Sequence, residues 1–589
     1  PLPSLGTLED LQGLGRLCRQ HGVLWGLHDN YIDIYPDSEG FSYDNVTFTP
    51  DGQPRRAWFN EGRNAQSYQF RPDRVQPFLR RNLDLIEPAL EPTSYFVDVW
   101  TSMNAFDYLD RHGAFHSKIE TLRCWGEAFA AIRRACGGGP MISEAGSDQL
   151  IGWVDGADCQ FLHLSPVGRP FNNHVPCRDW ARVPWFDAVN HTRLSLHGVG
   201  YPGRYEGGRG RLLHGIASDD YLSAEILTGH ALMIDLTNLG REAVRKYWLA
   251  QPFIESIALD EIERVDFAGG DIHRLAIRWR SGAQVWVNRS SDDWEVAGHI
   301  LPPFGFHATN GPVFSAIERL GGLIVERSMG AGTLYVNGRG YRPDAPLLIQ
   351  PEFAGFTPTG ERQFRLQVNW QTQKPAPRDL QVFYHFSRPV PGRYSPAEFY
   401  GGGTPATPTS QWRDRESTDF TVQIPEDMEP GEYTAMVGLY NPRGEGGRRY
   451  PLLGDETSDR RYRVGKLIVS GSSGKMSGLH FEPLSEPHRP DLRLVPNADP
   501  TDFGGIVTSG AVRVARQGGR LLLMPLPEGE DLEVSLVPSR LLDRPVRPTT
   551  LKAVDANGAR GRAIPFVQEG ETIRFTLRRS EFGCELSVD

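Results

Sequence analysis

The sequence predicts an α/β fold followed by all-β modules, specifically a (β/α)8-type TIM barrel and then β-sandwiches. Apolar strand-like runs alternate with helical patterns as far as about residue 257, which is typical of βαβ units. Beyond about residue 258 the pattern changes to short alternating strands divided by Gly, Ser-Asp and Pro. At 589 residues the chain is also too long for one hydrophobic core, so we expect several domains.

The run at residues 95–102, YFVDVWTS, is the strand around which the barrel prediction is built. Its aromatic and β-branched residues favour a buried strand, and a strand of a parallel sheet reads as a continuous apolar run. Asp98 at its end breaks that pattern. In a β/α barrel the carboxyl ends of the strands carry the chemistry, so Asp98 is the first catalytic candidate.

A second run of the same kind, PMISEAGSD at residues 140–148, follows a helical pattern over 119–134. Strand, helix and strand form a βαβ unit that places Asp98 and Glu144 on the same rim. Two carboxylates across a concave site are what glycoside hydrolysis requires, one as nucleophile or base and the other as acid. The pairing of Asp98 with Glu144 therefore predicts a glycosidase.

The rest of residues 1–257 fits the same barrel. Further helices are predicted at 8–20, 77–90, 219–230 and 241–257, and residues 39–64 are predicted to form a long loop with a turn at Asp51-Gly52. Strands are predicted near residues 23, 95, 140, 159, 193 and 231. A closed barrel needs eight strands. We therefore expect the first two units to precede Pro1, the alternative being an incomplete barrel.

The all-β part is predicted to hold three modules. Residues 258–345 are expected to form a β-sandwich packed on the barrel, and residues 346–470 an immunoglobulin-like sandwich. The Gly-Ser run at 471–474 has the composition of a linker. Residues 471–589 are accordingly predicted to be a linker and a C-terminal β-rich module.

Composition narrows the classes of partner. The 63 basic and 73 acidic residues give a net charge of −10 without a basic stripe, which argues against nucleic acid. No run of about 18 apolar residues occurs, so no membrane span is predicted.

The six cysteines form no CxxC pair and no zinc spacing, and no EF-hand loop is present. No metal ligand and no cofactor is predicted. The localisation is left open, with a secreted or periplasmic location favoured although no signal peptide is visible.

The order of motifs resembles one group of enzymes. HDNYIDIYP begins at His28, YFVDVW contains Asp98, Ser-Glu follows at Glu144, and Pro-Pro-Phe-Gly-Phe comes later at 302–306. This order resembles the retaining endo-α-N-acetylgalactosaminidase and α-N-acetylgalactosaminidase families over roughly residues 8–310. The resemblance implies a nucleophile at Asp98 on the fourth barrel strand and an acid/base at Glu144 on the fifth. It also implies that the strand bearing His28 lines the sugar pocket.

Further polar and aromatic residues at predicted strand ends are candidates for binding an oligosaccharide or glycoconjugate, each against a structural role as cap, turn or core residue. They are His28, Asp29, Asp33, Trp100, Asp148, His197 and Tyr201. Two alternatives to an α-N-acetylgalactosaminidase stay open. One is an α-glycosidase for galactose or glucose, and the other is a non-catalytic carbohydrate-binding protein.

Overall fold

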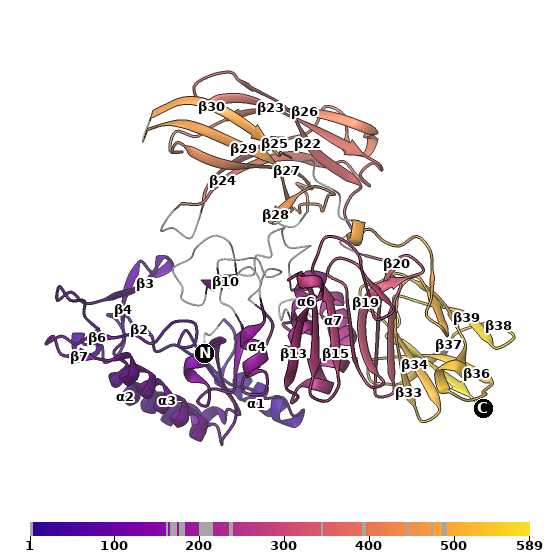
Figure 1. Cartoon of the computed structure of the whole chain (residues 1–589), viewed down its shortest axis with the longest axis horizontal. Helices are drawn as coiled ribbons and strands as arrows, with labels where there is room; N and C mark the ends of the chain where they lie inside the picture. Colours follow the sequence, from indigo (N-terminus) through magenta and orange to yellow (C-terminus); the bar gives the residue numbers. More distant parts are fainter. Residues whose placement is uncertain are drawn as a thin grey trace.

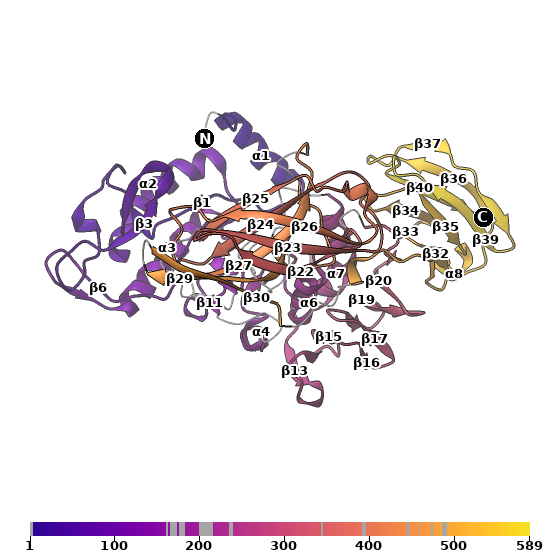
Figure 2. The same ribbon diagram turned by 90° about the horizontal axis from the view of Figure 1, so that it is seen from above.

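The computed structural model divides the chain into an N-terminal α/β region, a helix-backed sheet that continues into a C-terminal module, and a β-sandwich. In Figure 1 the α/β region and the helix-backed sheet lie side by side, with the sandwich above them, and Figure 2 shows the same arrangement from above. None of the helices in the described residues is long and apolar enough to cross a membrane. The structure describes residues 4–160, 183–199, 216–234, 240–342, 345–390, 396–444, 448–458, 460–472, 475–485 and 492–589, with the backbone of 163–164 and 174–175.

The α/β region is built on a five-stranded parallel sheet of order β1-β5-β8-β9-β12, so spatial order follows chain order. A parallel bridge between His197 and Ala231 continues the same order beyond β12. Within the described residues the sheet is open, and the predicted closed barrel is not shown. The strands are β1 (His28–Asp29), β5 (Tyr95–Val97), β8 (Met141–Ala145), β9 (Gly156–Cys159) and β12 (Ser195–Leu196).

Helices α1 (Leu8–Gln20), α2 (Val75–Leu90) and α3 (Lys118–Ala135) accompany this sheet. The helix predicted at 8–20 is confirmed, because Thr7 and Asp10 form a capping box at its start. Helices α2 and α3 bury Leu79, Leu83 and Phe129 in the core of the region. The β5–α3–β8 connection is therefore the predicted βαβ unit.

The long loop predicted at 39–64 carries secondary structure of its own. Its residues contribute β3 (Arg56–Asn60), which joins β4 (Ala65–Gln69) and β2 (Asp33–Ile34) in a three-stranded antiparallel sheet. The predicted turn at Asp51-Gly52 is present, because Gly52 has φ +76° and the Thr49 N–H donates to the carbonyl of Gln53. A second small hairpin pairs β6 (Tyr108–Leu109) with β7 (Phe115–His116).

The helix-backed sheet corrects the prediction of a β-sandwich at 258–345. One face of its antiparallel strands is covered by α6 (Asp219–Thr228) and α7 (Arg241–Ile257), which bury Leu222, Phe253 and Trp279 with it. An alternating strand pattern requires only that one face be covered, and here helices do so in place of a second sheet. The strands of this part are β13 (Ile262–Phe267), β14 (Arg274–Trp279), β15 (Gln284–Asn288), β18 (Phe306–Asn310), β19 (Val313–Leu320), β20 (Leu323–Gly330) and β21 (Thr333–Asn337), with the separate hairpin β16 (Trp294–Val296) and β17 (His299–Leu301).

The same sheet continues into the C-terminal module, since β21 pairs with β33 across a long separation in sequence. The last strands of this twelve-stranded sheet share a core with a second, five-stranded sheet. The strands of the first are β33 (Ala511–Gln517), β34 (Arg520–Pro525), β36 (Pro548–Val554), β37 (Arg560–Ala563) and β40 (Gly583–Val588), and those of the second are β31 (Thr501–Asp502), β32 (Ile506–Thr508), β35 (Leu532–Leu536), β38 (Val567–Glu569) and β39 (Thr572–Leu577).

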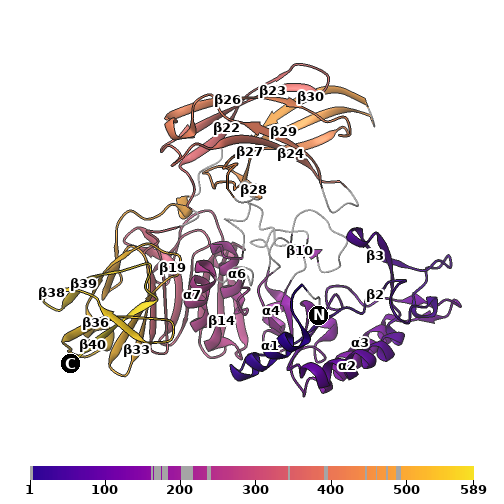
Figure 3. The ribbon, with the colours of Figure 1, turned by 180° about the vertical axis from the view of Figure 1, so that it is seen from behind.

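The β-sandwich packs two sheets around one large apolar core, and Figure 3 shows it from behind. Gly471 and Ser472, from the run predicted to be a linker, belong to a long strand, and Ser472 pairs with Lys475 of the next strand. The sheets contain β22 (Ile349–Pro358), β23 (Gln363–Thr372) and β26 (Asp414–Gln423), facing β24 (Gln381–Arg388), β25 (Ala397–Gly403), β27 (Gly431–Tyr440), β28 (Glu456–Ser458), β29 (Arg461–Ser472) and β30 (Lys475–Pro483).

Candidate active site

A cleft of about 520 Å³ opens on the parallel sheet of the α/β region. Both predicted catalytic carboxylates, Asp98 and Glu144, line it. The residues around the cleft are Gly26, Leu27, His28, Ser94, Tyr95, Phe96, Asp98, Ile142, Glu144 and Asp158. Most of them come from four neighbouring strands or the residues that flank them.

Three acidic residues lie in one row across this sheet. Val97 of β5 is in register with Ser143 of β8, so Asp98 and Glu144 occupy the next aligned positions. Ser143 is in turn in register with Ala157 of β9, which aligns Glu144 with Asp158. Side chains alternate between the faces of a strand, so these aligned positions project to the same side. The register therefore gathers three carboxyl groups at one face.

The backbone turns sharply just after Asp98. Val99 has φ +69°, a left-handed value that is rare for a β-branched residue. The Trp100 N–H donates to the Asp98 carbonyl at 2.9 Å, and the Ser102 N–H donates to the Val99 carbonyl at 2.8 Å. Strained turns of this type concentrate at functional sites, where surrounding contacts hold them in place. This turn ends β5 and leaves the Asp98 carboxylate at the cleft.

Asp98 is contacted by two side chains from the segment around β1. The His28 Nε2 atom lies 3.6 Å from Asp98 Oδ2, and the Asn30 amide donates to the same oxygen at 3.4 Å. Asn30 is itself held by the Ile32 N–H, which donates to its side-chain oxygen at 2.9 Å. The His28 strand, predicted to line a sugar pocket, thus lies beside Asp98 and contributes to the lining of the cleft.

Glu144 is more deeply placed than Asp98. The residue is 7% exposed, and its Oε2 atom lies 2.7 Å from the hydroxyl of Ser102. Thr101 supports the same strand end, because its hydroxyl accepts the Ala145 N–H at 3.0 Å. The segment that follows Asp98 thus packs directly against the end of β8 and fixes the two acidic residues relative to each other.

Asp29, a predicted sugar ligand, accepts hydrogen bonds from two tyrosines. The hydroxyls of Tyr31 and Tyr95 each donate to Asp29 Oδ2 at 2.7 Å, and Asn82 donates to the Tyr31 hydroxyl at 2.9 Å. Burial, together with the Asp29 charge, raises the pKa of both tyrosines well above the usual value. Both phenols therefore stay protonated, and Asp29 serves as their common acceptor.

Asp33 and Trp100 lie close to Asp98 but in different settings. Burial raises the pKa of Asp33, the Ser67 hydroxyl opposes this, and the nearby Asp98 charge raises it further. Trp100, predicted to stack on a sugar, is a core residue instead. It is 1% exposed, stacks on Trp125 with ring centroids 5.6 Å apart, and has no solvent-facing surface for a ligand.

The remaining predicted ligands are not among the cleft-lining residues named above, or lie outside the described residues. Asp148 is exposed and accepts a hydrogen bond from the Asn190 amide at 2.8 Å. His197 continues the parallel sheet, with its N–H donating to the Ala157 carbonyl at 3.2 Å, and burial lowers its pKa. Tyr201 lies outside the described residues.

Asp158 and Ser102 were not predicted as site residues. The sequence placed the strand near 159 two residues too late, beginning at Asp158, whereas β9 begins at Gly156. With the strand predicted to begin at Asp158, this residue was read as the start of an apolar run. In the structure Asp158 lies inside β9, where it is aligned with Glu144. Ser102 belonged to the run that contains Asp98, but hydroxyls near a strand end carry no specific signal.

In the described residues, the one group of three convergent metal-binding side chains lies far along the chain, at His299, His307 and Glu318.

No family model and no curated protein matches the chain. Solved structures are similar to it at low scores. An α-N-acetylgalactosaminidase from Bifidobacterium bifidum has a TM-score of 0.40 and 19% identity over 50% of this chain and 45% of its own. An α-galactosidase from Thermus thermophilus with bound stachyose has a TM-score of 0.19 and 19% identity over 31% and 36%. A cycloisomaltooligosaccharide glucanotransferase from Paenibacillus sp. has a TM-score of 0.28 and 10% identity over 99% and 75%. The chain thus spans less than half the length of the first of these enzymes.

Proposed function

We propose that the chain is a retaining glycoside hydrolase acting on α-linked sugars, with Asp98 as nucleophile and Glu144 as general acid/base. The observation that carries the proposal is the alignment of the two residues on neighbouring strands of one cleft. Neighbouring strands are about 4.8 Å apart. In retaining glycosidases the two carboxyl groups are about 5–5.5 Å apart. The strand spacing therefore suits a double displacement better than direct attack by water.

The contacts of Ser102 support the assignment of roles. Its hydroxyl lies 2.9 Å from the Val99 carbonyl and 2.7 Å from Glu144 Oε2, and a hydroxyl has only one hydrogen to donate. If Ser102 donates to Glu144, the carboxylate accepts in its ionised form; if Ser102 donates to Val99, Glu144 donates in its neutral form. One rotating hydroxyl can thus serve Glu144 in both of the states that an acid/base passes through. This arrangement accommodates a neutral Glu144, as a general acid requires.

The reaction would proceed in two steps. The Asp98 carboxylate attacks the anomeric carbon, the bond to the leaving oxygen breaks, and the Glu144 proton passes to that oxygen. Glu144, now ionised, then takes a proton from water, whose oxygen attacks the anomeric carbon and releases Asp98. The sugar leaves with its original configuration, and both carboxyl groups return to their starting states. Asp158, aligned with Glu144, is placed to accept hydrogen bonds from sugar hydroxyls.

The first sugar to test is α-linked N-acetylgalactosamine, because the His28, Asp98 and Glu144 motifs resemble those of the enzymes that release it. Galactose and glucose are the alternatives. The consecutive parallel order of the strands also supports a barrel-type architecture for residues 1–257, of which the described strands would form one wall.

The decisive experiment measures hydrolysis of aryl α-N-acetylgalactosaminide, α-galactoside and α-glucoside by the wild-type chain and by three variants. Asp98→Asn and Glu144→Gln are expected to lose activity. The control Asp148→Asn, exposed and outside the cleft lining, is expected to retain it. Nuclear magnetic resonance of the first-formed product should show the α-anomer. A β-anomer would contradict the retaining mechanism, and an active Asp98→Asn variant would contradict the nucleophile.

Azide separates the two roles from each other. With an Asp98→Gly variant, azide should attack the anomeric carbon directly and give the β-glycosyl azide. With Glu144→Ala, azide should intercept the glycosyl-enzyme and give the α-glycosyl azide. If Asp158→Ala and not Glu144→Ala gives the α-product, the acid/base role belongs to Asp158. Glycan binding without turnover by any form would identify a carbohydrate-binding protein instead.

A further inference from the structure

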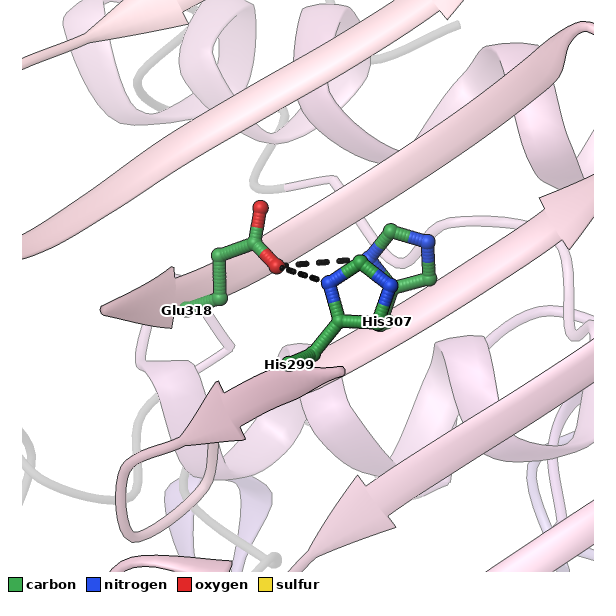
Figure 4. A group of neighbouring side chains, drawn as sticks. All are labelled: His299, His307 and Glu318. Atoms are coloured by element: carbon green, nitrogen blue, oxygen red, sulfur yellow. Dashed lines mark hydrogen bonds and ion pairs between the residues drawn. The ribbon is translucent and has the colours of Figure 1, made fainter. Parts of the chain in front are cut away.

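Two histidines and a glutamate meet on the outer face of the helix-backed sheet, far along the chain from the candidate active site. Glu318 on β19 points its Oε2 atom at both imidazoles, as Figure 4 shows. That oxygen lies 2.7 Å from His299 Nδ1 and 3.4 Å from His307 Nδ1. The two imidazole rings stack with centroids 3.6 Å apart at an interplanar angle of 21°.

The backbone register brings these side chains together from three strands. His307 on β18 is paired with Ala316 on β19, and Glu318, two residues further on, projects to the same face as Ala316. His299 reaches the face from β17, the second strand of a hairpin that forms its own small sheet. The spacing along the chain resembles no zinc motif, because each residue comes from a different strand.

Direct hydrogen bonding does not satisfy both imidazoles. His307 is 8% exposed, yet its Nδ1 atom makes no hydrogen bond in the part of the chain that is described. If both rings were protonated, two cations would stack face to face, which is unfavourable. With both rings neutral, His299 Nδ1–H can donate to Glu318 Oε2 at 2.7 Å, and a metal ion at this point would replace that proton.

Arg327 occupies the other side of Glu318 and completes the arrangement. Its Nε atom donates to Glu318 Oε1 at 2.8 Å, and its terminal nitrogen contacts the same oxygen. Oε1 is thereby held by the guanidinium, while Oε2 remains directed at the imidazoles. Carboxylates that ligate metals are commonly held in this way by a partner on their second oxygen.

We propose that His299, His307 and Glu318 bind one divalent transition metal ion of the zinc type. Zinc takes imidazole nitrogen at about 2.0–2.1 Å and carboxylate oxygen at about 2.0–2.2 Å, which places tetrahedral ligand atoms about 3.3 Å apart. The two measured contacts to Oε2 bracket that separation. All three ligand atoms lie within 4.8 Å of one another. The ion would join the β16–β17 hairpin to β18 and β19.

The test titrates Zn²⁺ into the chelator-treated full-length chain by isothermal calorimetry, with Co²⁺ absorption as a second probe. The wild-type chain should bind one ion and melt at a higher temperature with it. His299→Asn and Glu318→Gln should each weaken binding at least about 10-fold and abolish the shift in melting temperature. The matched control is His116→Asn, since His116 lies 3.2 Å from Glu120 but belongs to no group of three metal-binding side chains in the described residues. It should bind as the wild type does.

A second measurement needs no variant. Diethyl pyrocarbonate modifies accessible imidazoles, and the His299 side chain is 27% exposed. Zn²⁺ should protect His299, and not His116, from modification, as mapped by mass spectrometry. Absence of stoichiometric binding, binding that survives both ligand substitutions, or modification of His299 at the same rate with and without Zn²⁺ would each overturn the proposal.

Discussion

The carboxylates of the candidate active site and those beneath helices α6 and α7 are held in opposite ways. In the cleft, Asp98 meets His28 and Asn30, and Glu144 contacts the Ser102 hydroxyl. Within the described residues, Asp98 makes no ion pair with an arginine or lysine. Under the helices, Asp219 and Glu326 are both held by guanidinium groups.

The second group forms a buried ion cluster of Asp219, Arg245, Glu326 and Arg339. Arg245 lies 2.8 Å from Asp219 and 2.7 Å from Glu326, and Arg339 lies 2.9 Å and 2.8 Å from the same two residues. Burial alone would raise the pKa of Glu326, but Arg245 and Arg339 lower it to about 2. Two guanidinium groups keep such a carboxylate ionised and structural, whereas Asp98 has an imidazole and an amide beside it and no arginine or lysine in the described part of the chain.

Asp98→Asn should show the largest difference between the cleft carboxylates and those of the buried ion cluster, because it should affect activity and hardly affect stability. Loss of the nucleophile is expected to lower kcat/KM by about 10⁴-fold or more, equivalent to about 5.5 kcal/mol. The free energy of unfolding should change by no more than about 1 kcal/mol, because no buried cation loses its partner. Steady-state kinetics and denaturant unfolding of the same preparation measure both quantities. A variant that unfolds easily and keeps its turnover would reverse the comparison.

Glu326→Gln should show the opposite pattern. Removing the charge leaves two buried guanidinium groups under-compensated, which typically costs about 3–5 kcal/mol of unfolding free energy. Activity should persist below the lowered melting temperature. The control is Glu263→Gln on the same sheet, where Glu263 and Arg278 form an exposed pair at 3.7 Å that is worth less than about 1 kcal/mol. Equal losses in the two variants would show that the cluster contributes no more than a surface pair.

The pH dependence of the unfolding free energy tests whether ionised Glu326 stabilises the cluster. Because the pKa of Glu326 is about 2 when folded and near the usual 4.5 when unfolded, its contribution is fully present above pH 4.5. That contribution is lost as the pH falls from about 4.5 to about 2, and amounts to about 3 kcal/mol. The difference between the wild-type and Glu326→Gln unfolding free energies, measured from pH 6 to pH 2, should shrink over this range. A constant difference would contradict the assigned cause.

Val99→Gly should have the smallest effect. Glycine removes the strain of a left-handed valine but adds backbone freedom to the unfolded chain, so unfolding should change by about 1 kcal/mol or less. The looser turn should lower kcat about 10-fold with little change in KM, since Asp98 would be held less firmly. The matched comparison is Val99→Ala, which retains the left-handed strain. A normal kcat in Val99→Gly would show that this turn does not position Asp98.

Local patterns in the sequence were enough to predict several elements. The helix at 241–257 is confirmed at both ends as α7, and the strand before Asp98 is confirmed as β5. The βαβ unit that places Glu144 on the strand beside Asp98 is confirmed as well. These predictions succeeded because helical periodicity and apolar strand runs are properties of consecutive residues.

Contacts between distant residues were decided only by the tertiary structure. The register of β8 and β9 aligns Asp158 with Glu144. Trp100 is a core residue because Trp125 packs against it. The pairing of β21 with β33 and the meeting of two histidines with Glu318 likewise depend on which strands become neighbours. Period-two alternation tells which face of a strand is covered, but it does not specify the element that covers it or the strand that lies beside it. Asp98 and Glu144 could therefore be found as catalytic candidates from local patterns, whereas packing set their surroundings and the histidine cluster.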